Sequence, residues 1–542
     1  MWFICSKPAN ETFGSLHFLF FPHASLLSLV SYCVLLLLQP HTTMMESPRK
    51  YAEKEAFVTG HDGTTPLEIF LLCLAVPIGL RLYSKLTSCV THTNIKRYYW
   101  IEVIAIEFAT LIVPNLLLQT SLLPHIIGPS ALHLLMVILS YIIPHNKQSA
   151  TLQTTANNIN SSSRPPFLTV HRATIYIQTA IAILAVDFPI FPRRFCKTEI
   201  CGYGWMDLGA ASFIIIAGWS SSSSSSATSN SSNINSKRLV KKAIIKCAPL
   251  LILGLIRLIT IKGVEYQEHV SEYGVHWNFF FTLCCVEGSM VLWKFVKSHY
   301  FFSAKLLPYW DGMLACLLMI PYQWYLSIGG GQDFIENGPR QCSEEDFTSW
   351  SLSFCSAFVA NREGVLGIIG YLSLRLLSES MARYCIWPKV VEPNTIANLR
   401  QWRLLIASVV FWAAHFFLTS VLSVPNSRRS TNVPFILWSL AQNTSVLCLI
   451  HFAMTNSSSE PLLHHAPRIF NTVNRFGLPV FFVSNILTGL VNLLVDTIRS
   501  SNEKAMLVLS IYLMAVCALA VLLDKIFDNQ KRVVRVVDKK VN

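Results

Sequence analysis

One stretch of this chain combines residue types that carry acyl-transfer or acid–base chemistry. It begins at Asp187, passes through Arg193 and Arg194, and ends at Lys197. Asp187 closes an apolar segment, where a carboxylate can have its pKa raised toward the values of a general base. A nearby ammonium can stabilise an oxyanion. The spacing is too long for one helical face, so we expect a helix end followed by a loop that folds back.

A second polar stretch contains Glu268, His269, Glu272, His276 and Asn278. If it is helical, Glu268 and His269 lie four and three residues before Glu272, on one face of a short turn. Two His and two Glu are possible metal ligands, but their spacing is not HExxH, and we predict no metal. The mixture of donors and acceptors favours a hydrogen-bonding platform for a polyhydroxylated head group.

Polar residues also stand at the ends of other apolar segments. Arg362 opens one segment, and Asn492 and Asp496 close another. Ionisable groups at membrane depth cost several kcal/mol unless they are paired or hydrated, so a convergent set predicts a functional site. Each residue taken singly is more typical of an interfacial cap or ion pair, and only the set as a whole favours a functional site. His415, alone in an apolar run, is interpreted as a packed helix residue.

The elements that position these residues are membrane helices. Hydrophobic residues make up 52% of the 542 and charged residues only 13%, about half the usual ~25% of a soluble domain. This composition excludes an ordinary cytosolic protein, and a net charge of +13 with so few charges indicates basic loops beside a membrane rather than nucleic-acid binding. The fifteen Cys contain no CxxC pair, so no disulfide framework or zinc site is predicted.

We predict an all-α polytopic membrane protein with about thirteen transmembrane helices. The apolar stretches are Pro66–Tyr83, Trp100–Leu122, Ile126–Ile143, Val170–Asp187, Tyr203–Trp219, Ala243–Ile261, His276–Trp293, Leu306–Ile328, Gly364–Ala382, Trp402–Val424, Val433–Met454, Phe476–Asp496 and Ala505–Phe527.

Residues 1–44 are expected to form an N-terminal extension outside the working protein, although their apolar run Leu16–Leu38 is also compatible with an anchor. Residues 45–542 are then a single membrane domain. Two polar inserts, Asn146–Pro166 and the Ser-rich Ser220–Ser236, are predicted to be solvated loops because neither can bury enough apolar area to fold.

Charge counting predicts the orientation of this domain. Summed over alternate loops, Lys and Arg number roughly 26 on one side and 13 on the other, so the first side is cytosolic. The Ser-rich loop and the C-terminus then face the cytosol. The polar groups at the segment ends lie on or near the lumenal side.

Several long motifs resemble one family, the eukaryotic glucosaminyl-phosphatidylinositol acyltransferases, which include animal PIG-W and the fungal GPI-anchored wall transfer protein. The resemblance extends from about Lys54 to Phe527. The motifs are Phe57-Val-Thr-Gly60, Ala185-Val-Asp-Phe-Pro-Ile-Phe-Pro-Arg-Arg-Phe-Cys-Lys197, Trp205-Met-Asp-Leu-Gly209, Tyr266-Gln-Glu-His-Val-Ser-Glu-Tyr-Gly-Val-His-Trp-Asn-Phe-Phe-Phe-Thr282 and Asn485-Ile-Leu-Thr-Gly-Leu-Val-Asn-Leu493.

The resemblance implies an endoplasmic-reticulum enzyme that moves a fatty acyl chain, typically palmitoyl, from acyl-CoA to the inositol ring of GlcN-PI. Acyl-CoA is a co-substrate, and no bound cofactor is expected. The family's aspartate and lysine fall on Asp187 and Lys197. From their chemistry, Asp187 is expected to act as the base, and Lys197 to stabilise the oxyanion or to orient Asp187. The other residues are assigned to substrate binding, with the two arginines directed to phosphates: Arg193, Arg194, Glu268, His269, Glu272, His276, Asn278, Arg362, Asn492 and Asp496.

Two other functions fit a polytopic membrane protein. A lipid or solute transporter also uses polar residues within helices, but an odd number of spans without a visible inverted repeat argues against it. A noncatalytic scaffold of the GPI pathway is the second alternative. Incorporation of labelled acyl chains into GlcN-PI separates the enzyme from both.

Overall fold

The structure is a computed structural model that describes residue 57 and residues 59–90, 104–123, 126–144, 164–226, 236–264, 270–300, 307–342, 349–387, 393–455, 462–463 and 465–541. No β-strand occurs within these ranges, which confirms the all-α class. The predicted extension 1–44 and most of the insert Asn146–Pro166 lie outside them. The helices are α3 Pro66–Cys73, α4 Ala75–Val90, the π-helix η1 Phe108–Ile112, α6 Val113–Leu118, α7 Ile127–Ile142, α9 Pro166–Ala185, the 3-10 helix η2 Arg193–Phe195, α10 Trp205–Ser226, α11 Ser236–Val264, α12 Val270–Tyr273, α13 Phe279–Tyr300, α14 Leu307–Ser327, α15 Gly331–Asn337, α16 Ser349–Ala360, α17 Arg362–Cys385, α18 Pro393–Phe416, the π-helix η4 Phe417–Val421, α19 Val433–Met454, α20 Arg468–Arg475, α21 Gly477–Leu494 and α22 Asn502–Val541.

The helices form a membrane bundle. Each of the thirteen predicted stretches contains a helix, but only eight of the described helices are long and apolar enough to cross a bilayer. A ninth span results if α14 and α15, which are bent by 68° at their junction, act as one. Two predicted spans correspond to the shorter apolar helices Ile104–Leu118 and Ile127–Ile142. The polytopic class is therefore confirmed, and the number thirteen is not.

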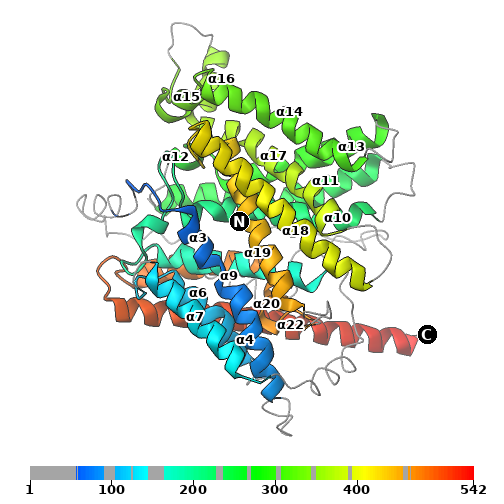
Figure 1. Ribbon diagram of the computed structural model, residues 1–542. Coiled ribbons are helices and arrows are strands. Elements are labelled where there is room, and N and C mark those ends of the chain that lie inside the picture. The colour runs from blue at the N-terminus through cyan, green and yellow to red at the C-terminus, as the bar shows by residue number, and fades with distance from the viewer. Residues whose placement is uncertain are drawn as a thin grey trace, which may run out of the picture.

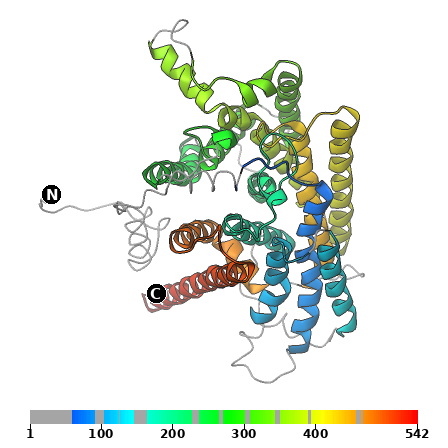
Figure 2. The same ribbon diagram turned by 90° about the vertical axis from the view of Figure 1, so that its left-hand side faces the viewer.

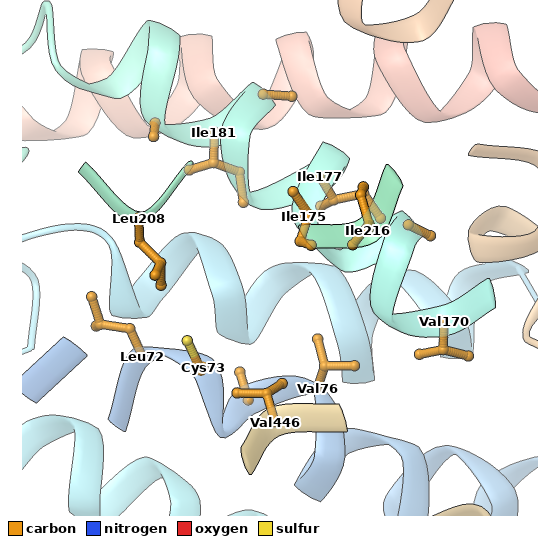
Figure 3. Close-up of a cluster of buried hydrophobic side chains, with 14 of the residues drawn as sticks. Leu72, Cys73, Val76, Val170, Ile175, Ile177, Ile181, Leu208, Ile216 and Val446 are labelled. Atoms are coloured by element: carbon orange, nitrogen blue, oxygen red, sulfur yellow. The ribbon is translucent and has the colours of Figure 1, made fainter. Parts of the chain in front are cut away.

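The core lies where α9 and α19 cross the middle of the bundle. Both helices are buried over most of their length, as is typical of helices hydrophobic on all faces. Figure 3 shows Val446 of α19 beside Cys73 of α3 and Val76 of α4, and it shows Ile175 and Ile177 of α9 grouped with Ile216 of α10.

The other helices pack around this core in pairs. α18 lies along α19, α10 and α14 lie along α17, and α11 lies along α13. In Figure 1, α13 and α14 are at the top, and α4, α7 and α22 are at the bottom. Figure 2 shows α18 at the edge opposite α21 and α22. The short helices α12 and α15 lie toward the left of Figure 1, whereas α22 ends at the right.

The Ser-rich insert begins later than predicted. α10 continues through Ser226, so the expected loop at Ser220 is wrong for its first residues. The hydroxyl of Ser220 donates to the carbonyl of Ile216 one turn earlier, and Ser221 donates to Glu379 of α17 at 2.8 Å. These contacts stabilise helix where composition alone predicts loop. Residues 227–235 lie outside the described ranges.

One cystine links the connection after α15 to α16. Cys342 and Cys355 are disulfide-bonded, with their Cα atoms 6.1 Å apart. The sequence predicts no disulfide framework and does not identify this single pair, because the two cysteines are 13 residues apart and share no spacing motif. No disulfide framework of several bridges appears among the described residues.

Candidate active site

The loop between α9 and α10 folds back as predicted, and Arg193 organises it. Its guanidinium donates to the carbonyls of Val186 at 2.9 Å, Phe188 at 2.8 Å and Phe191 at 2.9 Å. It also stacks on the ring of Phe57, 4.1 Å from the centroid. These contacts direct Arg193 to its own loop rather than to a phosphate, because backbone carbonyls occupy its donors.

Arg194 ties the same loop to α3. Its guanidinium grips the buried carboxylate of Glu68 through Nε at 3.0 Å and Nη2 at 2.8 Å. Bidentate pairing of this kind fixes geometry as well as charge. Thr64 donates a further hydrogen bond to Glu68. In this arrangement Arg194 is the partner of a buried acid, and phosphate binding would require it to leave that acid.

Asp187 meets α21 where α9 ends. The side-chain amide of Asn492 donates to Asp187 Oδ2 at 2.8 Å, a contact that spans 305 residues of sequence. The structure thus brings together two predicted site residues from separate motifs. Asp496, one turn beyond Asn492, has an exposed side chain, and its backbone carbonyl accepts from Ser500.

Lys197 meets the predicted acidic stretch at Glu272. The two charges are 2.6 Å apart, and the Lys197 side chain is 36% exposed against 17% for Glu272. An ammonium has three donors, so the pairing leaves two of them for other partners. Lys197 is therefore both anchored and accessible.

Glu272 is in turn held by Arg428, a residue that the sequence pattern does not single out. Arg428 contacts Glu272 at 3.4 Å and Asp207 at 2.7 Å. Asp207 also accepts hydrogen bonds from the backbone N–H groups of Thr198 and Gly204, at 3.2 and 3.0 Å. These contacts lead from Lys197 through Glu272, Arg428 and Asp207 back to the same loop, because Thr198 directly follows Lys197.

The charges around Lys197 act on one another. Burial alone raises the pKa of Glu272, but Lys197 and Arg428 outweigh it and hold that pKa at about 2. Burial lowers the pKa of Arg428, yet its two carboxylate partners raise it above its ordinary value. The thiol of Cys196 has its pKa raised, first by burial, and the charges of Lys197 and Asp187 both act on it. The proposed base and ammonium therefore lie around one loop.

Arg429 follows Arg428 in the connection between α18 and α19, and it reaches the start of α17. Arg429 contacts Glu363 at 3.1 Å, and Arg340 grips Glu363 with both Nη atoms, at 2.7 and 3.1 Å. Arg362 is buried beside them and donates to the carbonyls of Ile335 and Pro339. Arg362 thus anchors α15 on α17 rather than facing a substrate.

The connection between α18 and α19 that carries both arginines is unusual. Seven consecutive polar residues, Asn426–Asn432, are all buried. Thr431 has a left-handed backbone with φ of 49°, which is strained for a β-branched residue. A Cβ on Gly370 of α17 would lie 2.2 Å from the carbonyl oxygen of Thr431, so only glycine allows this approach. Asn426, Ser427 and Asn432 each donate to a backbone carbonyl, of Gly202, Ile200 and Pro425, and such partners stabilise a buried polar connection.

The predicted head-group platform is only partly described. Glu268 and His269 lie outside the described residues. The side chain of His276 is exposed, and its backbone N–H donates to Asn361 at 2.8 Å. Asn278 accepts from the backbone of Phe280 and donates to the carbonyl of Gly254, so it caps α13 and joins it to α11. Its contact with the sugar stays a prediction.

His415 is buried, as expected for a packed residue, but it is specifically bonded. Its Nδ1 lies 3.0 Å from the carbonyl of Pro434, which can only accept, so Nδ1 carries the proton. Nε2 then accepts from the hydroxyl of Tyr203 at 2.9 Å. The contact joins α18 to the loop before α10, close to the motif that contains Asp207.

The structure therefore joins Asp187 to Asn492 and Lys197 to Glu272, and it connects Glu272 to the arginine pair beside Glu363. The convergence of the polar segment ends on one lumenal site, which would place Asp187, His276, Arg362 and Asp496 together, stays a prediction. Among the described residues no group of three or more His, Cys, Asp and Glu is arranged to hold a metal.

Comparison with known proteins agrees with these motifs. The sequence profile of the GWT1 family matches residues 50–523. The GPI-anchored wall transfer protein 1 of Emericella nidulans is 32% identical over 513 residues, covering 88% of this chain and 98% of that protein. The protein of the same name from Yarrowia lipolytica is 33% identical over 374 residues, or 66% and 72% of the two chains. The phosphatidylinositol-glycan biosynthesis class W protein of Dictyostelium discoideum is 30% identical over 524 residues, or 87% and 97%.

Proposed function

Because this chain belongs to the GWT1 family of membrane proteins in GPI-anchor biosynthesis, we propose that it is the inositol acyltransferase of that pathway. It transfers a fatty acyl chain, palmitoyl by preference, from acyl-CoA to the inositol ring of GlcN-PI. The observation that supports this most directly is the pairing of Asp187 and Lys197 with distant partners around one loop.

Asp187 is proposed to act as the general base. As an inositol hydroxyl oxygen attacks the thioester carbonyl carbon, its proton passes to the Asp187 carboxylate. Asn492 donates to Oδ2 of Asp187 and so helps to fix the orientation of the carboxylate. No covalent acyl-enzyme is required, because a thioester is already activated.

Lys197 is proposed to stabilise the oxyanion of the tetrahedral intermediate. Its pairing with Glu272 fixes the ammonium and leaves two N–H donors for the developing negative charge. When the carbon–sulfur bond breaks, the CoA thiolate takes the proton from Asp187, which restores the base. The products are the inositol ester and free CoA.

Arg428 would compensate the negative charges of Asp207 and Glu272 in this site. It faces two carboxylates, so Glu272 is not left with Lys197 as its sole partner when the ammonium turns to substrate. His276, with its exposed side chain, and the predicted residues Glu268 and His269 would contact the glucosamine-inositol head group. We place the enzyme in the endoplasmic reticulum membrane with this site on the lumenal side and the C-terminus in the cytosol.

The test is direct acyl transfer by purified full-length protein. Reconstituted protein is supplied with labelled palmitoyl-CoA and GlcN-PI, and the lipid product is identified by mass spectrometry. Stoichiometric appearance of acylated GlcN-PI and free CoA supports the proposal. Movement of GlcN-PI between leaflets without a new ester would support the transporter alternative. If neither result is obtained, the noncatalytic scaffold is the remaining alternative.

A further inference from the structure

A second charged network lies along the C-terminal half of α17, away from Asp187, Lys197 and their partners. Arg375, Glu379 and Arg383 recur every four residues and therefore share one face of the helix. Arg375 and Glu379 are almost wholly buried. Charges at this depth require partners, and the neighbouring helices supply them.

The partners come from three surrounding helices. Arg375 contacts Glu287 of α13 at 3.3 Å, and Glu287 contacts Lys246 of α11 at 2.7 Å. Lys294 of α13 contacts Glu379 at 3.5 Å.

The outer end of the network is built around Asp311 of α14, which is fully buried. Arg383 contacts Asp311 at 2.7 Å, and Lys297 of α13 also pairs with it. Together these contacts form a continuous lane from the middle of α17 to its C-terminal end. We call this set the basic lane: Lys246, Glu287, Lys294, Lys297, Asp311, Arg375, Glu379 and Arg383.

The basic lane carries more positive than negative charge. Five cations face three carboxylates in the described part of the chain, an excess of two. An anionic ligand would balance this excess.

Two lysines of the basic lane are partly exposed. The side chains of Lys246 and Lys294 are 43% and 29% exposed, whereas Asp311 and Glu379 are buried. Along α17 the lane lies at the end opposite Glu363, and the sixteen residues from Glu363 to Glu379 span about 24 Å at 1.5 Å per residue. The excess of Lys and Arg in the loops at this end marks it as the cytosolic side.

We propose that the basic lane binds phosphate groups that enter the protein from its cytosolic side. Lysine ammonium groups and arginine forks are the usual protein ligands of phosphate. If the proposed function is correct, the phosphates of CoA are the natural occupant, held at one end of α17 while the acyl thioester reaches toward the other. An anionic lipid head group presents the same chemistry from the cytosolic leaflet.

The variant that tests the lane is Lys246→Gln combined with Lys294→Gln. It removes two partly exposed cations without orphaning a buried acid, because Glu287 keeps Arg375, and Glu379 keeps Arg375 and Arg383. Lys241→Gln is the matched control, since Lys241 is an exposed lysine of the same helix α11 outside the lane. Thermal unfolding in detergent verifies that all variants fold.

Two probes distinguish the source of the phosphate. Binding of CoA itself to purified full-length protein is measured by calorimetry, and retention of phosphatidylinositol against phosphatidylcholine is measured by native mass spectrometry. We expect the double variant to bind CoA at least about tenfold more weakly, because charged hydrogen bonds are lost. The control should stay within about twofold of the native protein.

The outcomes separate this proposal from the proposed function. Weaker CoA binding assigns the lane to CoA, and unchanged CoA binding with loss of phosphatidylinositol assigns it to a lipid phosphate. If the double variant changes neither CoA binding nor phosphatidylinositol retention, the lane does not bind phosphate, whatever the acyl-transfer assay shows. If the native protein binds CoA through the lane but forms no acylated GlcN-PI, the lane stands and the proposed function fails.

Discussion

At the scale of single residues, the proposed chemistry depends on two side chains that are held differently. Asp187 has a neutral partner, Asn492, whereas Lys197 has a charged one, Glu272. A neutral donor orients a carboxylate without adding charge, and a charged partner fixes an ammonium while reducing its net field. The two partners therefore predict different consequences when they are replaced.

Asp187→Asn and Lys197→Ala should each abolish acyl transfer, with product falling at least about a thousandfold toward background. Both side chains are partly accessible, so the protein should remain inserted and folded. Transfer is measured with GlcN-PI in detergent extracts that contain equal amounts of folded protein. Near-normal turnover by either variant would remove that residue from the catalytic role.

Asn492→Leu should lower kcat about tenfold with little change in KM, because it removes a hydrogen bond to the charged base. Asn492→Asp should move the acid limb of the pH profile upward, since a second carboxylate raises the pKa of the first. Asn485→Leu is the control, because Asn485 is exposed on the same helix and donates to its own backbone. Equal losses in both leucine variants would indicate damage to α21 instead.

Glu272 predicts an acid-sensitive contribution to stability. Its folded pKa of about 2 lies below the ordinary 4.5, so its stabilisation is present above about pH 5 and is lost as pH falls toward 2. The shift corresponds to about 3 kcal/mol. Glu272→Gln should be less stable at pH 6 and should lose less stability on acidification. Glu503→Gln, at an exposed position of α22, should keep the native pH dependence in the same detergent melts.

The residues differ in how far the sequence alone can identify them. Asp187 and Lys197 are predictable because they border a distinctive motif beside a helix end. Arg428 is not, because its partners Asp207 and Glu272 lie 221 and 156 residues away along the chain, and only the tertiary structure brings them together. The usable signal is the long polar run between two apolar segments, which charge counting treats as an ordinary loop.

At the scale of elements, hydrophobic length locates the helices, and packing decides their extent. The predicted helix end at Asp187 is confirmed to within two residues, since α9 ends at Ala185. The end of α10 escapes prediction because contacts with α9 and α17 stabilise its serines, and no local propensity encodes such contacts. The left-handed backbone of Thr431 is also not predictable from the sequence, because the surrounding core stabilises a conformation that is strained for this residue type.

The close approach of α17 to the connection between α18 and α19 predicts a strong effect of a single methyl group. Gly370→Ala should destabilise the protein by about 1–3 kcal/mol, because the new Cβ meets the backbone of Thr431. Gly209→Ala in α10 should be neutral or stabilising by about 0.5–1 kcal/mol, because nothing lies within 4 Å of its Cβ position. Melting temperatures of the two purified variants decide the comparison, and a stable Gly370→Ala would contradict this packing.

At the scale of the whole molecule, the family match begins at residue 50, near the predicted start of the working domain. Removal of residues 1–43 should therefore leave acyl transfer unchanged. Removal of residues 227–235 should do the same, whereas a deletion that includes Ser220 and Ser221 should destabilise α10. Complementation of a strain that lacks the acyltransferase measures all three. Failure of the shortened chain that begins at Met44 would show that Leu16–Leu38 is a required span.

The cystine between Cys342 and Cys355 has a consequence for the whole molecule because disulfides persist in oxidising compartments and are rare in the reducing cytosol. Arg340, two residues before Cys342, pairs with Glu363 beside the arginine connection, so the bond reports the redox environment of that face. In sealed microsomes, a membrane-impermeant reductant should leave the bond intact until the vesicles are opened. The cystine then serves as an internal marker of sidedness that is independent of any count of lysines and arginines.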